Sequence, residues 1–204
     1  MKHVHPDQVS LFRVSLPCGF APKIGCGSLA RPVLLALERT PGIIEAWLNQ
    51  AGTLLAVAGS KTFTAERCAR VVKATLQAED IATEELRGQA RAGALEDFLA
   101  AGTDWLRGTN VDQLSSREAA IIAARLVKRL QRKTAVSEQV ARSLAAAIAA
   151  FFKRRFLRDR IEPEQVDHSG EELIKIATAY LDERSMGAFA NALEEGYRPG
   201  PGES

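Results

Sequence analysis

The sequence predicts an α+β protein of two domains, because its two halves carry different hydrophobic patterns. The first half alternates short apolar runs, which are typical of strands, with amphipathic segments that have a helical period. The second half holds longer alanine-rich segments with a helical period and with capping signals at their starts. A chain of 204 residues, 46% of them hydrophobic, can bury a core in each of two small domains.

The first half is predicted to form strands and helices in a particular order. The run VSLFRVSL at 9–16 alternates, with a shift of phase between Leu11 and Val14, and predicts a strand with one buried face. In chain order, the expected elements are this strand, a helix between Ser28 and Pro41, two strands within 43–59 joined by a turn at 49–52, a helix that starts after Thr64, and a short strand near 79–86. This is the order of a ferredoxin-like split βαβ arrangement, which we expect over residues 8–90.

The second half is predicted to be an α-helical bundle over residues 93–197. The expected helices are 94–107, 116–133, 138–158 and 170–195. Capping boxes begin at Ser115 and Ser169, and the short connections favour antiparallel neighbours. The run ARAGA near residue 92 marks the expected boundary between the domains. The final run YRPGPGES predicts a disordered tail at 198–204.

Composition and charge exclude several classes of protein. The net charge of +2 gives no overall field that would favour nucleic acid or an acidic substrate. The N-terminal run MKHVHPDQVSLFRVSL lacks the long apolar core of a signal peptide, and no uncharged stretch reaches the length of a membrane span. We therefore expect a cytoplasmic protein without a membrane span, in which the cysteines are thiols and not disulfides.

Charge is segregated within the second half. Residues 117–160 contain twelve Lys or Arg against three Asp or Glu, whereas residues 161–204 contain three against ten. This pattern favours internal charge complementarity between neighbouring helices. The alternative is a basic strip that meets an acidic partner or a phosphate backbone. It would be formed by Arg125, Lys128, Arg129 and Arg132 and continued by the run FKRRFLRDR at 152–160. We expect no nucleic acid, and a partner protein or a homo-oligomer contact through the helical domain.

The segment LPCGFAPKIGCGSLARP at 16–32 holds two of the three cysteines at the head of the first predicted helix. A thiolate at a helix N-terminus gains from the helix dipole, which lowers the pKa of the thiol. Soft thiolates suit copper as Cu(I), mercury as Hg(II) or zinc as Zn(II). Cys18 and Cys26 are therefore the candidate metal ligands, although the same pair could form a redox couple. Cys68 falls on the apolar side of the second predicted helix, which favours a buried structural thiol.

The segment ARPVLLALERTPGIIEAWLNQAGTLLAVAG resembles the heavy-metal-associated (HMA) domain family. It carries a helix, a Pro-Gly-Ile turn at 41–43, an asparagine at Asn49 and two strands, as members of that family do. The resemblance covers residues 8–86. It implies a ferredoxin-like fold and the binding of a soft metal ion.

The metal motif departs from the Met-x-Cys-x-x-Cys pattern of the HMA family. Cys26 matches the first cysteine, whereas Leu29 stands at the second and Ile24 at the methionine. Cys18 precedes the inserted run GFAPKIG and could fold back to replace the missing ligand. A branch of the family lacks metal-binding cysteines and uses the domain for contacts within larger assemblies, and the run NQAGTLLAV is similar to that branch.

Several functions thus stay open. The first is a soft-metal binding or trafficking protein with a helical docking domain, and the second is a metal-free HMA-like interaction module or scaffold. The cysteine pair adds a redox sensor, and the basic strip adds a transcriptional regulator. We expect no enzyme, because the sequence holds no paired carboxylates, no phosphate loop and no nucleophile–His–Asp set.

Overall fold

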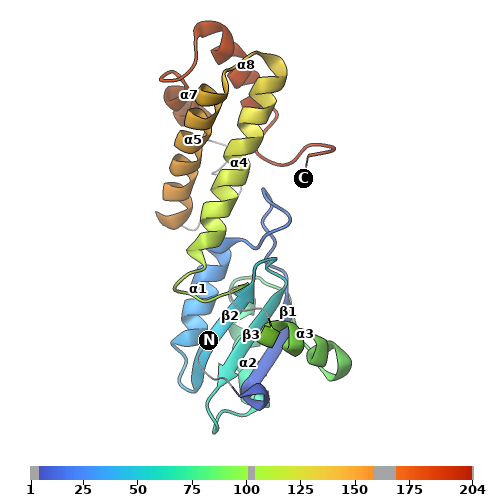
Figure 1. The fold of residues 1–204 in the computed structure, drawn as a ribbon. Helices are drawn as coiled ribbons and strands as arrows, with labels where there is room; N and C mark the ends of the chain where they lie inside the picture. The colour runs from blue at the N-terminus through green and yellow to red at the C-terminus, as the bar shows by residue number, and fades with distance from the viewer. Residues whose placement is uncertain (1–4, 101–103, 159–168, 204) are drawn as a thin grey trace. The chain divides into compact units, whose positions relative to one another are not determined.

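The computed structural model describes residues 5–100, 104–158 and 169–203. Within these residues the fold is mixed α/β, with one five-stranded antiparallel sheet and seven α-helices, several of them toward the C-terminus (Figure 1). The chain divides into two compact units. We call Met1–Cys18 with Lys23–Leu114 the sheet unit, and Gly19–Pro22 with Ser115–Ser204 the helical unit.

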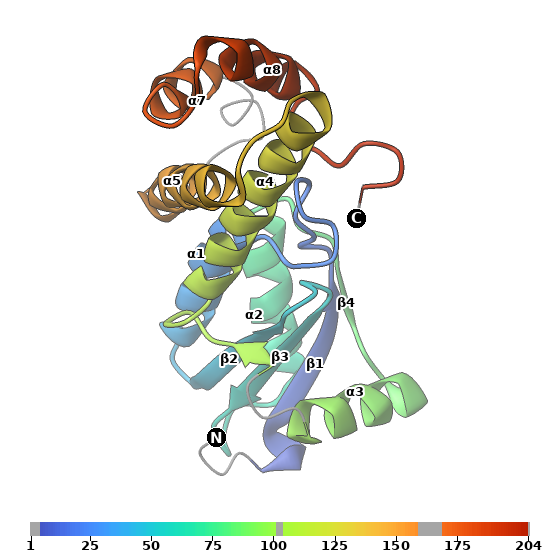
Figure 2. The same ribbon diagram turned by 45° about the horizontal axis from the view of Figure 1, so that its top comes forward.

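The sheet has the strand order β4-β1-β3-β2-β5, and each neighbouring pair is antiparallel (Figure 2). The strands are β1 (Val9–Val14), β2 (Ile43–Asn49), β3 (Leu54–Gly59), β4 (Thr83–Glu85) and β5 (Trp105–Leu106). The turn between β2 and β3 follows from its sequence. The side-chain oxygen of Asn49 accepts hydrogen bonds from the main-chain N–H groups of Thr53 at 2.9 Å and Leu54 at 3.0 Å, which closes the hairpin.

Two helices, α1 (Gly27–Glu38) and α2 (Ala65–Gln77), cover one face of the sheet. The hydroxyl of Thr64 caps α2 by accepting from the N–H of Arg67 at 3.3 Å, as the sequence predicts. Leu37 and Val72 are fully buried in the core beneath these helices. Burial of each such side chain contributes about 1.5–3 kcal/mol.

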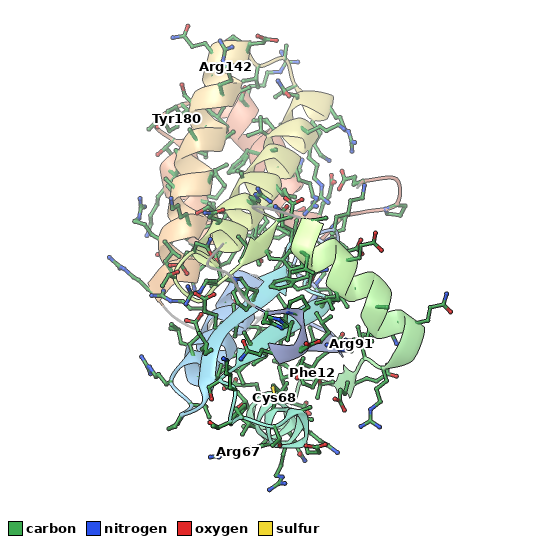
Figure 3. The ribbon with its side chains drawn as sticks, turned by 60° about the horizontal axis from the view of Figure 1, so that its bottom comes forward. Phe12, Arg67, Cys68, Arg91, Arg142 and Tyr180 are labelled. Carbon is green, nitrogen blue, oxygen red and sulfur yellow. The ribbon has the colours of Figure 1, made fainter. Side chains whose placement is uncertain are left out.

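The helix α3 (Gly88–Ala100) covers the opposite face. Phe98 of α3 packs edge-on against Trp47 and Trp105, with ring centroids 5.1 and 5.0 Å apart. Arg91 fixes the other end of α3, because its guanidinium donates to the carbonyl of Val9 at 3.0 Å (Figure 3). The sheet is therefore buried on both faces.

Double-sided burial explains the shift of phase in the first strand. Val9 and Leu11 belong to the cluster under α3, whereas Phe12 and Val14 belong to the cluster under α1 and α2. The prediction of a strand with one buried face is therefore wrong. A strand that is buried on both sides carries apolar residues at both parities, so its pattern shows no single alternation.

The helix expected at 94–107 is also wrong at its end. Helix α3 ends at Ala100, and Trp105 and Leu106 pair with β2 as the edge strand β5. Trp105 gains its ring contact with Phe98, and Leu106 enters the core under α1 and α2. Both α3 and β5 thus belong to the sheet unit, whose last residue is Leu114, whereas the sequence places the boundary near residue 92.

The helical unit contains most of α4 (Asp112–Lys133), together with α5 (Glu138–Arg158), α7 (Gly170–Ala177) and α8 (Glu183–Glu194). The single helix expected at 170–195 is interrupted. The carboxylate of Asp182 accepts from the N–H of Ser185 at 2.8 Å, and this N-cap starts a new helix. Fully buried side chains form the interior, and they include Leu126, Leu144, Phe152 and Phe189.

No helix within the described ranges has the length and apolarity that crossing a membrane requires. The expected disordered tail at 198–204 is described up to residue 203. The side chain of Glu203 and main-chain groups of Arg198 and Gly200 in this segment make the contacts presented below.

Candidate functional site

Cys18 and Cys26 lie on the two arms of a short antiparallel pairing. The N–H of Cys18 donates to the carbonyl of Ile24 at 3.0 Å, and the N–H of Cys26 donates to the carbonyl of Leu16 at 2.7 Å. Pro17 and Gly25 form the bridge between these two bonds. Because side chains alternate along paired arms, the residues on either side of the bridge share one face. The two cysteines are therefore diagonal neighbours on one face, where such pairs lie about 7–8 Å apart.

The turn between β2 and β3 holds this cysteine loop in place. The N–H of Leu16 donates to the carbonyl of Gly52 at 3.0 Å, and the N–H of Gly25 donates to the carbonyl of Gln50 at 2.7 Å. The backbones approach so closely that a Cβ on Gly25 would lie 2.9 Å from the Cα of Gly52. Gly52 also has a positive φ of 72°. Both positions therefore require glycine, and the hairpin turn sets where the cysteines lie.

Cys26 stands at the N-cap of α1 and is half-buried. Its main-chain carbonyl accepts the first bond of the helix, from Ala30 at 3.0 Å, while its sulfur lies 3.2 Å from the hydroxyl oxygen of Ser28. The sulfur is thus held at the positive end of the helix dipole, which favours negative charge there.

Cys18 is only 2% exposed and is one of the buried apolar residues. Leu29 and Ile24, the residues that the sequence comparison sets against the second cysteine and the methionine of the HMA pattern, pack against the core beneath α1 and α2. The structure thus brings Cys18 and Cys26 to one face and gives the other two positions an apolar role. Among the residues that the structure describes, no group of three or more His, Cys, Asp or Glu side chains is placed to hold a metal ion.

Cys68 lies in α2 and belongs to the core of the sheet unit, as expected (Figure 3). Burial raises the pKa of its thiol, a contact with Ser10 lowers it, and the charge of Glu85 raises it further. A thiol with a raised pKa carries little thiolate near neutral pH and is a poor nucleophile and ligand. Cys68 is thus a packing residue.

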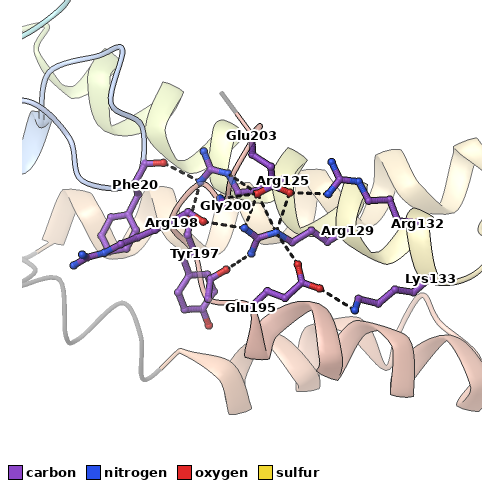
Figure 4. A network of polar contacts seen from close by, with 11 residues as sticks. Phe20, Arg125, Arg129, Arg132, Lys133, Glu195, Tyr197, Arg198, Gly200 and Glu203 are labelled. Atoms are coloured by element: carbon purple, nitrogen blue, oxygen red, sulfur yellow. Dashed lines mark hydrogen bonds and ion pairs between the residues drawn. The ribbon is translucent and has the colours of Figure 1, made fainter.

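Three residues of the predicted basic strip, Arg125, Arg129 and Arg132, contact the segment 195–203, which follows α8 (Figure 4). Arg129 is 2% exposed, and its guanidinium donates to the carboxylate of Glu203 at 2.6 Å. Arg132 reaches the same carboxylate at 2.9 Å, and Lys133 forms an ion pair with Glu195 at 2.8 Å. This geometry supports the internal complementarity that the charge pattern favours. No sequence pattern assigns a role to Glu203, because it lies in a run of glycine and proline that is typical of disorder.

Comparison of the chain with protein-family models, with curated proteins and with solved structures gives no match. The cysteine loop and the arginine cluster are thus the two candidate sites. Both cysteines lie in the sheet unit, whereas the arginines lie in the helical unit together with Gly19–Pro22 of the loop.

Proposed function

We propose that the protein binds one soft metal ion, Cu(I) or Hg(II), through the thiolates of Cys18 and Cys26, and serves in the binding or trafficking of that ion. The observation that carries this proposal is the antiparallel pairing of 16–18 with 24–26, which puts both sulfur-bearing residues on one face at the head of α1. Soft thiolates select soft ions, and the helix dipole favours their negative charge.

The sheet unit supports the proposal at the level of architecture. Its elements run β1-α1-β2-β3-α2-β4, and its strands lie in the order β4-β1-β3-β2, which is what a ferredoxin-like split βαβ domain requires. We propose that the unit is such a domain of the HMA type, with β5 and α3 as additions. Helix α3 covers the sheet face that α1 and α2 leave free.

The donor set favours ions that accept two ligands. Structural zinc is almost always bound by four ligands, whereas the loop offers two thiols. Metal–sulfur bonds of about 2.3 Å hold two sulfurs at most about 4.6 Å apart on a shared ion. The diagonal spacing of about 7–8 Å between the residues must therefore be closed by the side chains and by movement of the loop. Zn(II) stays the weakest of the three candidates.

Anaerobic titration with Cu(I) against a chromophoric chelator tests the proposal. We expect one ion per chain in the parent, and a loss of about 100-fold or more in affinity in Cys18→Ser and in Cys26→Ser, because each loses half of the ligands. Cys68→Ala is the matched control, since it removes a thiol from the same unit, and it should keep the parent affinity. Equal affinity for Cu(I) in the parent and all three variants would contradict the proposal.

A metal-free interaction module is the second candidate, and the burial of Cys18 favours it. A thiol that is 2% exposed, beside apolar residues at the other ligand positions, also fits a loop that serves only to pack. On this proposal the chain contacts a partner protein or a second copy of itself through the helical unit. The same titration then gives no bound Cu(I), and sedimentation of the parent in the presence and absence of Cu(I) gives one unchanged species.

A further inference from the structure

Three arginines of α4 converge on the segment that follows α8 (Figure 4). Arg125, Arg129 and Arg132 are spaced i, i+4 and i+7, so they lie on one side of the helix. The Glu203 carboxylate accepts from Arg129 at 2.6 Å and from Arg132 at 2.9 Å, and it also accepts from the N–H of Gly200 at 3.1 Å. Two guanidinium groups and one main-chain N–H around one carboxylate are the arrangement of an oxyanion-binding site.

Main-chain carbonyls also accept hydrogen bonds from the two buried arginines, Arg125 and Arg129. Arg125 donates to the carbonyls of Phe20 at 2.8 Å and Tyr197 at 2.6 Å. Arg129 donates to the carbonyls of Gly196 and Arg198. We call residues 196–203 the strap. Hydrogen bonds and ion pairs join it to α4, whereas its buried Tyr197 packs against Phe152 of α5 with ring centroids 5.5 Å apart.

The Glu203 side chain is held among the arginines and is largely shielded from solvent. Its side chain is 11% exposed, and the hydrogen bond from Arg129 lowers the pKa of its carboxyl to about 2. A surface pocket of ≈ 280 Å³ adjoins the carboxylate, and its lining includes Arg125, Lys128 and Gly202. This volume is small for a drug-sized molecule and suits a small anion.

We propose that the arginine cluster of α4 is a binding site for a phosphate group, and that Glu203 is a tethered carboxylate that occupies the site when the strap is closed. The proposal does not require metal binding, and the two sites meet in the cysteine loop, whose Phe20 carbonyl accepts from Arg125. When the strap leaves, Arg125 and Arg129 lose carbonyl acceptors together with the carboxylate. A phosphate dianion brings more acceptor oxygens and one more negative charge than a carboxylate, and it matches the planar fork of a guanidinium.

The test is calorimetric titration of the full chain with inorganic phosphate. We expect Glu203→Gln to bind phosphate about tenfold or more tightly than the parent, because the competing charge is gone. Adding Arg132→Gln to Glu203→Gln should remove that gain. Adding Lys133→Gln is the matched control and should keep it, since Lys133 pairs with Glu195 and not with the carboxylate of Glu203. Acetate should show little gain in any variant.

Two outcomes overturn the proposal: no gain in Glu203→Gln, or an equal gain with and without Arg132. Phosphoserine, tested beside inorganic phosphate, separates an esterified phosphate from a free one, and tighter binding of either by Glu203→Gln than by the parent supports the site. If the Glu203→Gln variant loses its helical circular dichroism signal, it has not folded, and the test is then made on the parent protein. Phosphate must then shift the amide resonance of Gly200 in the NMR spectrum of the parent, and an unchanged resonance at saturating phosphate overturns the proposal.

Discussion

The guanidinium of Arg129 and the carboxylate of Glu203 form an almost fully buried ion pair, with 2.6 Å between Nη2 and Oε2 and with side chains 2% and 11% exposed. The partners are separated by 74 residues in the sequence. The pair links the C-terminal part of α4 to the strap that follows α8. Two charges that leave water together are stable only when hydrogen bonds satisfy them, and here the carbonyls of Gly196 and Arg198 and the N–H of Gly200 complete that set.

Removal of Arg129 should destabilise the helical unit strongly. We expect Arg129→Ala to lower the free energy of unfolding of this unit by about 3–5 kcal/mol. The substitution removes the nearest donor to the Glu203 carboxylate, and the carbonyls of Gly196 and Arg198 lose the same donor. Arg142→Ala is the control on the neighbouring helix α5. Arg142 is 77% exposed and lies 3.9 Å from Glu138, so its loss should change stability by about 0.5 kcal/mol or less. Denaturant unfolding followed by helical circular dichroism measures both. Equal effects in the two variants would contradict the buried pair.

Acid should weaken the same unit through Glu203. Its pKa is lowered in the folded state from 4.5 to about 2, first through the hydrogen bond from Arg129 and against the cost of burial. A lowered pKa gives stability that is present above pH 4.5 and is lost as the pH falls from there toward 2. Glu203→Gln has no such proton to bind, so its stability should fall less over that interval. Unfolding curves at several pH values give the two slopes, and parallel slopes would show that Glu203 is not held as described.

The second face of the sheet gives a prediction for α3. Phe98 is 2% exposed between two tryptophan rings, so Phe98→Ala should cost the sheet unit about 3–5 kcal/mol. Leu99 is the next residue of the same helix and is 43% exposed, so Leu99→Ala should stay within about 0.5 kcal/mol. Tryptophan fluorescence follows the unfolding of this unit, since Trp47 and Trp105 flank Phe98. A small loss in Phe98→Ala would mean that α3 does not seal the sheet.

Local signals in the sequence predicted most of the elements, and long-range contacts decided the rest. The Asn49 turn and the Thr64 cap act within a few residues, so the sequence shows them directly. Trp105 follows a helical segment, and its place in an edge strand depends on partners in β2 and α3 that no local pattern reveals. Asp182 is a local signal that the continuous apolar period around it obscures, because its carboxylate accepts from the N–H of Ser185, three residues later, and starts a new helix.

The residues of the candidate sites also differ in whether a local sequence pattern predicts them. Cys18 and Cys26 were found from their residue type and their place before a helix, and the structure adds that they share one face of a short pairing. The arginine strip was found from its spacing on a predicted helix. The contact of Glu203 with this strip is not predictable from the sequence, because Glu203 lies about 70 residues later in a segment whose composition predicts disorder. A buried arginine needs an acceptor, and the excess of acids after residue 160 was the one signal that pointed to it.

The contact between Gly52 and the cysteine loop gives the last prediction. A Cβ at this position would lie 2.5 Å from the carbonyl oxygen of Leu16 and 2.6 Å from the Cα of Gly25, and φ is +72°. Gly52→Ala should therefore cost about 1–2 kcal/mol from the backbone conformation alone, and more from the overlap. Because the overlap pushes on the arm that carries Cys18, the variant should also bind Cu(I) more weakly than the parent. Gly93→Ala is the control, since Gly93 lies within α3 with open space around it and should gain about 0.5–1 kcal/mol. If Gly52→Ala is destabilised while its Cu(I) affinity equals that of the parent, the hairpin turn does not position the cysteines, and the metal proposal loses its structural basis.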